Sequence, residues 1–332
     1  MTPTLEELLA SARVVDLPLR APFRGLTRRE ALLFEGPSGW AEWAPFRDHS
    51  DAHSARWLLA AIEQAYGSWP EPVRESVPVN AILPDLGAAA SANWAAEQFA
   101  AGLRTFKLKV GHEARVDAAR VAAVREAVGS GAALRVDANG RWTQDEAVEV
   151  LPRLLRAAGE LEYVEQPCAS LRDCAAVRRA LPVRIAVDEG VRLAGDPAAV
   201  ADALLAAADV IVLKSIPLGG VRDALELAEV VGLPVVVSGS LDTSVGIASG
   251  VALASALPEL DFACGLGTGA LFDADVVSEP VLPIRGELRP SRVVPEPELL
   301  ERYASSAEVA GEWQARLARC HALLERDERE SL

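Results

Sequence analysis

Three lysines and three acids recur at comparable places along this 332-residue chain. Each ends, or nearly ends, a short β-branched apolar run. From the second lysine onward the spacings are 28, 28, 23 and 26 residues, each about one strand-plus-helix unit. Ammonium groups and carboxylates gathered at one site are suited to removing a carbon-bound proton with the help of a metal ion. The six residues are Lys107, Lys109, Asp137, Glu165, Asp188 and Lys214.

The scarcity of lysine adds to this pattern. Of 33 lysines and arginines only three are lysines, so arginine supplies nearly all the positive charge. A guanidinium does not lose its proton in proteins, whereas an ammonium can. Compositional drift could also have left three surface lysines, but their location within apolar runs favours a chemical role.

The acids Asp137, Glu165 and Asp188 are predicted metal ligands. A single acid at a strand end is more often a helix cap or a solvated residue. Three acids on consecutive strands would repel one another unless a cation lay between them. An all-oxygen set suits Mg²⁺, with Mn²⁺ able to substitute.

The predicted chemistry is proton removal next to a carboxylate. The resulting enediolate carries two negative charges, which a bound Mg²⁺ stabilises. A lysine acts as base only if its environment disfavours the protonated form. Lys109 and Lys214 would approach the substrate from opposite sides. Lys107 is expected to support Lys109, or to serve as a structural ion-pair partner.

The elements that position these residues read as alternating strands and helices. Eight apolar runs separated by Ala-rich helical segments predict an α/β fold with a closed (β/α)8-type, TIM-like barrel. An open doubly wound sheet is the alternative, but no GxGxxG loop follows an early strand. The polar residues would then share one level at the carboxyl ends of the strands. The runs are 79–84, 105–110, 133–138, 162–167, 183–188, 208–214, 234–239 and 260–265.

The flanking segments predict an α+β capping domain. An antiparallel meander covers residues 12–46, a helix follows at 51–66, and a Pro-rich connector ends this region. The chain returns to helix after about residue 290, where it would pack on the N-terminal part. We expect a capping domain at 1–80, a catalytic barrel at 81–289 and a C-terminal segment at 290–332.

Composition limits the class of partner. A net charge of −15 argues against nucleic acid and anionic membranes, so a small carboxylate substrate is expected. No apolar run approaches 18 residues and the N-terminus carries acids, which predicts a cytoplasmic protein. The four cysteines show no CxxC pairing and read as reduced thiols. A monomer is compatible with the sequence.

At these residues the chain resembles the enolase superfamily, specifically its muconate-lactonizing branch. The superfamily uses a Lys or His base with one or two Mg²⁺ ions. The end of the seventh predicted strand carries Ser-Gly-Ser rather than His, so a His base is not expected. The motifs that carry the resemblance are FKLKVG, RVDANGRW, YVEQP, AVDEG and VLKSIPLGG, spanning about residues 104–220.

Within that branch the resemblance implies a dehydratase. Its implied reaction is syn-elimination of water from 2-succinyl-6-hydroxy-2,4-cyclohexadiene-1-carboxylate, a step of menaquinone biosynthesis. Lys109 would take the α-proton and return it to the leaving hydroxide, and Lys214 would stabilise the enediolate and the aromatising ring. The resemblance also implies substrate contacts from Arg24, Arg135, Asn139, Ser238, Gly239 and Ser240.

Two alternatives stay open at this stage. Relatives with the same pair of lysines racemise N-acylamino acids or epimerise dipeptides, because bases on both faces permit proton removal and return from either side. A non-catalytic barrel that only binds a ligand would have lost a lysine or an acid, but all are present.

Overall fold

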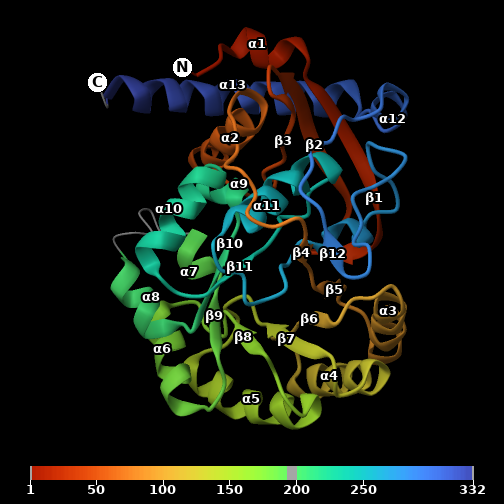
Figure 1. Cartoon of the computed structure of the whole chain (residues 1–332), viewed down its shortest axis with the longest axis vertical. Coiled ribbons are helices and arrows are strands. Elements are labelled where there is room, and N and C mark those ends of the chain that lie inside the picture. The colour runs from red at the N-terminus through yellow and green to blue at the C-terminus, as the bar shows by residue number, and fades with distance from the viewer. Residues whose placement is uncertain (1, 193–199, 331–332) are drawn as a thin grey trace.

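The computed structural model, which describes residues 2–192 and 200–330, combines a curled parallel sheet surrounded by helices with a smaller domain of antiparallel strands and helices (Figure 1). The smaller domain lies over one end of the sheet, and helix α13 crosses its outer side. This arrangement confirms the predicted barrel with an α+β cap.

Seven strands form the parallel sheet, in the order β11-β10-β9-β8-β7-β6-β5. Each is a short run rich in Val, Ile, Leu and Ala, and nearly every residue in it is buried, as expected for a sheet covered on both faces. The strands are β5 (Ala81–Leu83), β6 (Thr105–Lys109), β7 (Ala133–Asp137), β8 (Tyr163–Glu165), β9 (Ile185–Val187), β10 (Val210–Leu213) and β11 (Val235–Val237).

The connecting helices pack around the outside of this sheet. Several begin with a side-chain cap; Thr143, for example, forms a reciprocal capping box with Glu146. The helices are α3 (Ala88–Ala100), α4 (Ala114–Val128), α5 (Gln144–Ala158), α6 (Leu171–Ala180), α7 (Glu189–Arg192), α8 (Ala201–Ala207), α9 (Ser215–Leu218), α10 (Val221–Val231) and α11 (Ser244–Ala256).

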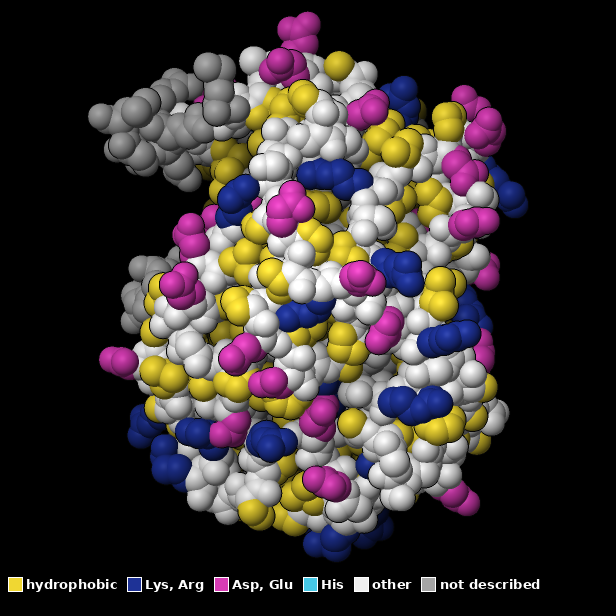
Figure 2. Space-filling view, viewed as in Figure 1, with side chains coloured by type: hydrophobic (Ala, Val, Ile, Leu, Met, Phe, Trp, Pro, Cys, Tyr) yellow, Lys and Arg dark blue, Asp and Glu magenta, His cyan; other side chains and the backbone are white. Residues whose placement is uncertain are grey.

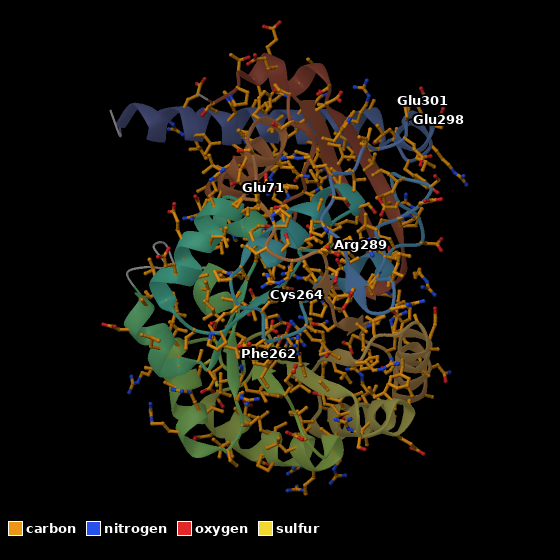
Figure 3. The ribbon with its side chains drawn as sticks, in the orientation of Figure 1. Glu71, Phe262, Cys264, Arg289, Glu298 and Glu301 are labelled. Carbon is orange, nitrogen blue, oxygen red and sulfur yellow. The ribbon has the colours of Figure 1, made fainter. Side chains whose placement is uncertain are left out.

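The eighth predicted strand, 260–265, closes the barrel without forming a ladder. Cys264 bridges to Val79 and Gly265 bridges to Ser238, so the segment joins the two edges of the sheet through single bridges. Phe262 and Cys264 mark its course in Figure 3. The Ala263 carbonyl instead accepts a hydrogen bond from Arg135 Nη1 at 2.7 Å, because this guanidinium is buried inside the barrel.

The strand register corrects the expectation that all site residues share one level. Lys109, Asp137 and Glu165 are directly paired across β6, β7 and β8. Glu165, however, pairs with Ala186, so Asp188 lies two residues beyond that level. Closing a sheet into a barrel requires tilted strands and a staggered register, and the sequence spacing includes this stagger.

The capping domain is built from both ends of the chain. Strands β1, β2 and β3 form the predicted antiparallel meander, and α13 packs on α2. Trp43, Trp57 and Trp313 are buried in their shared core. The limits 1–80, 81–289 and 290–332 stay a prediction. The elements are α1 (Leu5–Ala10), β1 (Arg13–Phe23), β2 (Leu26–Gly36), β3 (Gly39–Trp43), α2 (Asp51–Tyr66), α12 (Pro297–Arg302) and α13 (Ala307–Glu330), with a small sheet of β4 (Val77–Pro78) and β12 (Glu287–Leu288) below them.

The surface mixes charges of both signs. Acidic and basic side chains are interspersed on the face that Figure 2 shows, without a large basic patch. Among the described residues, no helix has the length and apolar character needed to cross a membrane.

Closure of the barrel at Gly267 gives a first prediction. A Cβ at this position would lie 2.5 Å from the Asn80 carbonyl oxygen, and this backbone atom has little room to move. Gly267→Ala should therefore lower the free energy of unfolding, measured by urea denaturation, by about 1–3 kcal/mol.

Gly311→Ala is the matched control, because no heavy atom lies within 4 Å of its added Cβ and the site is on the exposed side of α13. It should raise stability by about 0.5–1 kcal/mol through helix propensity. Equal stabilities for the Gly267 variant and the wild type would contradict the tight closure.

Candidate active site

A pocket lies between the carboxyl ends of the barrel strands and residues of the capping domain. This is the end at which barrel enzymes place their catalytic groups. Most of the residues predicted from sequence line it: Arg24, Lys107, Lys109, Asp137, Asn139, Asp188, Lys214, Ser238, Gly239 and Ser240.

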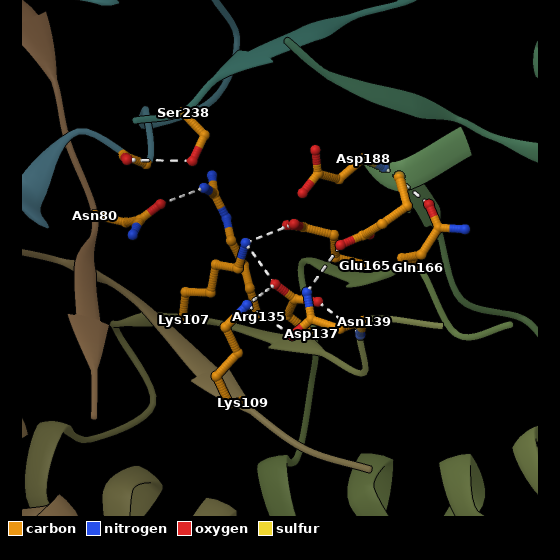
Figure 4. A network of polar contacts seen from close by, with 12 residues as sticks. Asn80, Lys107, Lys109, Arg135, Asp137, Asn139, Glu165, Gln166, Asp188 and Ser238 are labelled. Carbon is orange, nitrogen blue, oxygen red and sulfur yellow. Dashed lines mark hydrogen bonds and ion pairs between the residues drawn. The ribbon is translucent and has the colours of Figure 1, made fainter. Parts of the chain in front are cut away.

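Lysines and acids form a connected network on one side of the pocket (Figure 4). Lys107 Nζ lies 2.6 Å from Glu165 Oε1 and 2.8 Å from Asp137 Oδ2. Lys109 Nζ contacts the same Asp137 oxygen at 2.6 Å, and the Asn139 side-chain oxygen at 2.8 Å. Two ammonium groups thus converge on one buried carboxylate.

Lys214 lies on another side of the pocket from Lys109. It follows β10 directly, and its Nζ donates to Asp188 Oδ2 at 2.7 Å. Strands β7, β8 and β9 separate it from the strand that carries Lys109. The two amines therefore reach the pocket from different strands, and their approach to opposite sides of a substrate stays a prediction.

Burial and pairing act in opposition on the pKa values of this network. Burial works to raise the pKa of Asp137, but the ammonium groups of Lys107 and Lys109 hold it well below its usual range. Burial disfavours charged Lys107, yet Asp137 and Glu165 keep its pKa well above the ordinary value. The protonated form of Lys107 is therefore favoured in this arrangement.

Glu165 has the opposite balance. Burial and the negative charges of Asp137 and Asp188 outweigh Lys107 and raise the pKa of Glu165 to about 7. Its Oε2 is buried and has no hydrogen-bond partner among the described residues. A buried, unsatisfied carboxylate oxygen beside two further acids suits a hard cation, which would supply the missing partner.

The three acids do not yet surround one point. Among the described His, Cys, Asp and Glu residues, no group of three is arranged as ligands of a single metal ion. The lysines account for this, since one oxygen each of Asp137, Glu165 and Asp188 is turned toward an ammonium group. Binding of Mg²⁺ would require these oxygens to be shared or turned.

Two residues with left-handed backbone conformation hold the strand ends in place. Asn139 has φ 48°, and its backbone N–H donates to Asp137 Oδ1 at 2.9 Å. Gln166 has φ 39°, and its side-chain oxygen accepts from the backbone N–H of Asp188 at 3.1 Å. Unfavourable backbone angles that are fixed by such bonds are typical of functional sites.

Arg135 occupies a place that the sequence did not indicate. It does not line the pocket but lies fully buried inside the barrel, stacked over the Tyr163 ring at 4.6 Å. Its guanidinium donates to Glu162 Oε2 at 2.5 Å and to Asn80 Oδ1 at 2.9 Å. This placement corrects the expectation that Arg135 contacts the substrate, because its guanidinium is buried inside the barrel and is not part of the pocket lining.

Other pocket residues were not anticipated. Glu189 lines the pocket and accepts a hydrogen bond from Asn139 Nδ2 at 3.1 Å; its position next to Asp188 in the sequence was an available signal. Phe23, Phe46 and Trp57 supply an aromatic wall from the capping domain. No motif in the sequence links these aromatic residues to the strand ends.

Comparisons with known proteins match both parts of the chain. Residues 90–295 match the "Enolase C-terminal domain-like" family, and residues 14–65 match the "Enolase N-terminal domain-like" family.

Curated relatives extend the similarity over nearly the whole length. The chain is 49% identical to o-succinylbenzoate synthase of Thermobifida fusca (strain YX), over 96% of this chain and 99% of that one. It is 46% identical to o-succinylbenzoate synthase of Mycobacterium leprae (strain TN), over 98% and 95%.

Solved structures share the fold. 2-Chloromuconate cycloisomerase from Rhodococcus opacus 1CP aligns with a TM-score of 0.75 at 26% identity, covering 89% of this chain and 98% of that one. L-Ala-D/L-Glu epimerase from Bacillus subtilis aligns with a TM-score of 0.74 at 22% identity, covering 86% and 96%. The second likeness concerns the fold alone.

The raised pKa of Glu165 predicts a pH-dependent stability difference in metal-free protein. Between about pH 4.5 and pH 7 the folded state holds a proton on Glu165 that the unfolded state has lost, so stability falls as pH rises through this window. Glu165→Gln does not titrate. The free energy of unfolding of this variant minus that of the wild type should therefore increase by up to about 2–3 kcal/mol between pH 4.5 and pH 8.

Urea denaturation in the presence of a chelator measures this difference. Glu126→Gln, on the exposed side of α4, is the control and should follow the wild type at each pH. A difference between Glu165→Gln and the wild type that stays constant across this range would show that Glu165 is ionised throughout.

Proposed function

The chain belongs to the enolase superfamily and, within it, to the o-succinylbenzoate synthases, and on this basis we propose how its site works. The reaction is the dehydration of 2-succinyl-6-hydroxy-2,4-cyclohexadiene-1-carboxylate to 2-succinylbenzoate, a lyase step of menaquinone biosynthesis. The observation that carries this proposal is the near full-length identity of 49% to a synthase of this name. Both molecules are small dicarboxylates, which suits a reaction in the cytoplasm.

Asp137, Glu165 and Asp188 are the residues that would hold a divalent cation. Their oxygen-only chemistry, their burial and the unsatisfied Oε2 of Glu165 support Mg²⁺, with Mn²⁺ as a substitute. The bound ion supplies positive charge against the enediolate that forms when the α-proton leaves. Lys107, kept charged by Asp137 and Glu165, adds a fixed positive charge to the same side.

Lys109 is the proposed base. Its amine takes the proton α to the ring carboxylate and returns it to the departing hydroxide, so that water leaves from the same face. The electrons of the broken C–H bond form the ring double bond as the C–O bond breaks. Asn139 orients Lys109 through the 2.8 Å contact, and Lys214 stabilises negative charge from the other side of the pocket.

The remaining contacts orient the substrate. Ser238, Gly239 and Ser240 would accommodate the succinyl arm. Arg24 lines the pocket from the loop after β1, with its guanidinium 4.3 Å from the Phe46 ring, and suits a substrate carboxylate. Arg135 would act indirectly, by fixing the barrel interior below Lys107.

Racemisation of an N-acylamino acid, or epimerisation of a dipeptide, is the alternative that two opposed lysines permit. Incubation in deuterated water separates the two. A dehydratase forms 2-succinylbenzoate, which absorbs in the ultraviolet, whereas a racemase introduces deuterium into recovered N-acylamino acid. Deuterium incorporation without formation of 2-succinylbenzoate would contradict the proposed function.

Two variants should separate base from metal ligand. Lys109→Ala should lower kcat at least about a thousandfold because the proton acceptor is gone, with the Kd for Mg²⁺ within about threefold of the wild type. Glu165→Ala should weaken Mg²⁺ binding at least about tenfold. Turnover is followed by ultraviolet absorbance and Mg²⁺ binding by calorimetry. Retained turnover in Lys109→Ala, or undiminished Mg²⁺ affinity in Glu165→Ala, would refute the corresponding assignment.

A further inference from the structure

The loop at 238–243 forms the pocket wall between β11 and α11. Four of its residues, Ser238 to Leu241, line the pocket. Leu241 has φ 66°, a left-handed conformation that a branched residue rarely adopts. Such a conformation persists only where the surrounding structure fixes it. Barrel backbone holds Ser238 and Gly239 through Leu213 and Gly265, whereas capping-domain side chains bind Leu241 and Thr243.

Arg29, on β2, is the first of these contacts. It is only 3% exposed, and its Nε donates to the Leu241 carbonyl oxygen at 3.0 Å. Its Nη2 donates to the Ala44 carbonyl oxygen, and its guanidinium lies 4.4 Å from the Phe46 ring. One buried cation therefore links the strained loop residue to the aromatic wall on the opposite domain.

Glu42, on β3, is the second contact. It is 1% exposed, and its Oε2 accepts from Thr243 Oγ1 at 2.5 Å, from Thr243 N–H at 2.9 Å and from Gly246 N–H at 3.2 Å. A capping-domain side chain thus satisfies donors at the start of barrel helix α11. Any side chain at Gly246 would interfere, since a Cβ there would lie 2.7 Å from the Glu42 carboxyl carbon.

Burial of the Glu42 carboxyl group affects its pKa. Burial and the neighbouring Asp242 raise the pKa of Glu42 to about 8, although Thr243 and Arg29 oppose this. A neutral amide at this position keeps the accepting oxygen, whereas an apolar side chain does not. The chemistry of the contact can therefore be tested separately from its shape.

We propose that Arg29 and Glu42 are positioning residues that hold the 238–243 loop in its pocket-lining conformation, so that the capping domain sets the shape of a substrate-binding wall that belongs to the barrel. Neither side chain is among the described residues that line the pocket, so neither touches the reacting atoms. Their loss acts on substrate affinity and leaves the strand-end lysines and acids in place. The KM measurement uses the substrate of the proposed function and so rests on it, whereas the loop contact itself does not.

The test compares Arg29→Met with Arg28→Met. Arg28 lies next to Arg29 on β2, is exposed and pairs with Asp16 at the surface. Backbone hydrogen exchange, followed by mass spectrometry, should become at least about tenfold faster at 238–246 in Arg29→Met, with little change in β1 to β3. The KM for substrate should rise about tenfold, with kcat within about threefold of the wild type. Arg28→Met should match the wild type in all three measurements.

Glu42→Leu and Glu42→Gln form a second pair. The leucine variant should show the same faster exchange and raised KM, and the glutamine variant should remain close to the wild type because it keeps the acceptor. If either loss variant fails to fold, Glu42→Asp withdraws the carboxyl group from Thr243 through its shorter side chain without changing any charge and should reproduce the effect.

Two results would overturn the proposal. One is unchanged exchange at 238–246 with unchanged KM in the loss variants. The other is faster exchange throughout β1 to β3, which would show that Arg29 and Glu42 only stabilise the capping-domain core. If the wild type itself fails to form 2-succinylbenzoate, the proposed function is wrong, and the exchange pattern alone still decides the role of the two residues.

Discussion

The buried ion pairs of Lys107 with Asp137 and Glu165 are the constraint on which the rest of the structure depends. Charges removed from water are tolerated only when they are paired, and removal of one partner leaves an uncompensated charge inside the barrel. The pairs span three neighbouring strands, β6, β7 and β8, so the sheet must form in register before any of these charges is satisfied.

The capping domain does more than cover the pocket. It supplies the aromatic wall of the pocket, and Arg29 and Glu42 extend from it to the loop that carries Ser238 to Ser240. The two sides of the pocket are thus held in place by different parts of the molecule. The lysines and acids are fixed by the barrel, whereas the 238–243 loop is held by the barrel at Ser238 and Gly239 and by the capping domain at Leu241 and Thr243.

The sequence predicted the barrel and the strand-end residues because both follow local rules: apolar runs form strands, side chains alternate, and parallel strands end together. The prediction that Asp188 lies at the same level as Glu165 was wrong, because the stagger between strands is a property of the closed barrel and not of any one strand. Arg135 was misplaced because its partners, Asn80 and Glu162, come from other strands and loops. Phe46, Arg29 and Glu42 carry no local signal, since their contacts form only when the domains pack.

Isotopic labelling of lysine tests the central claim, that the three acids bind a cation and that the three lysines lie next to it in the same site. The chain holds only three lysines, so the spectrum has three side-chain signals, each assigned by a single substitution. Saturating Mg²⁺ should shift all three signals, and Lys107 should keep its charge to a higher pH than an ordinary lysine. Signals that do not respond to Mg²⁺, or a Lys107 that titrates as an exposed lysine does, would contradict it.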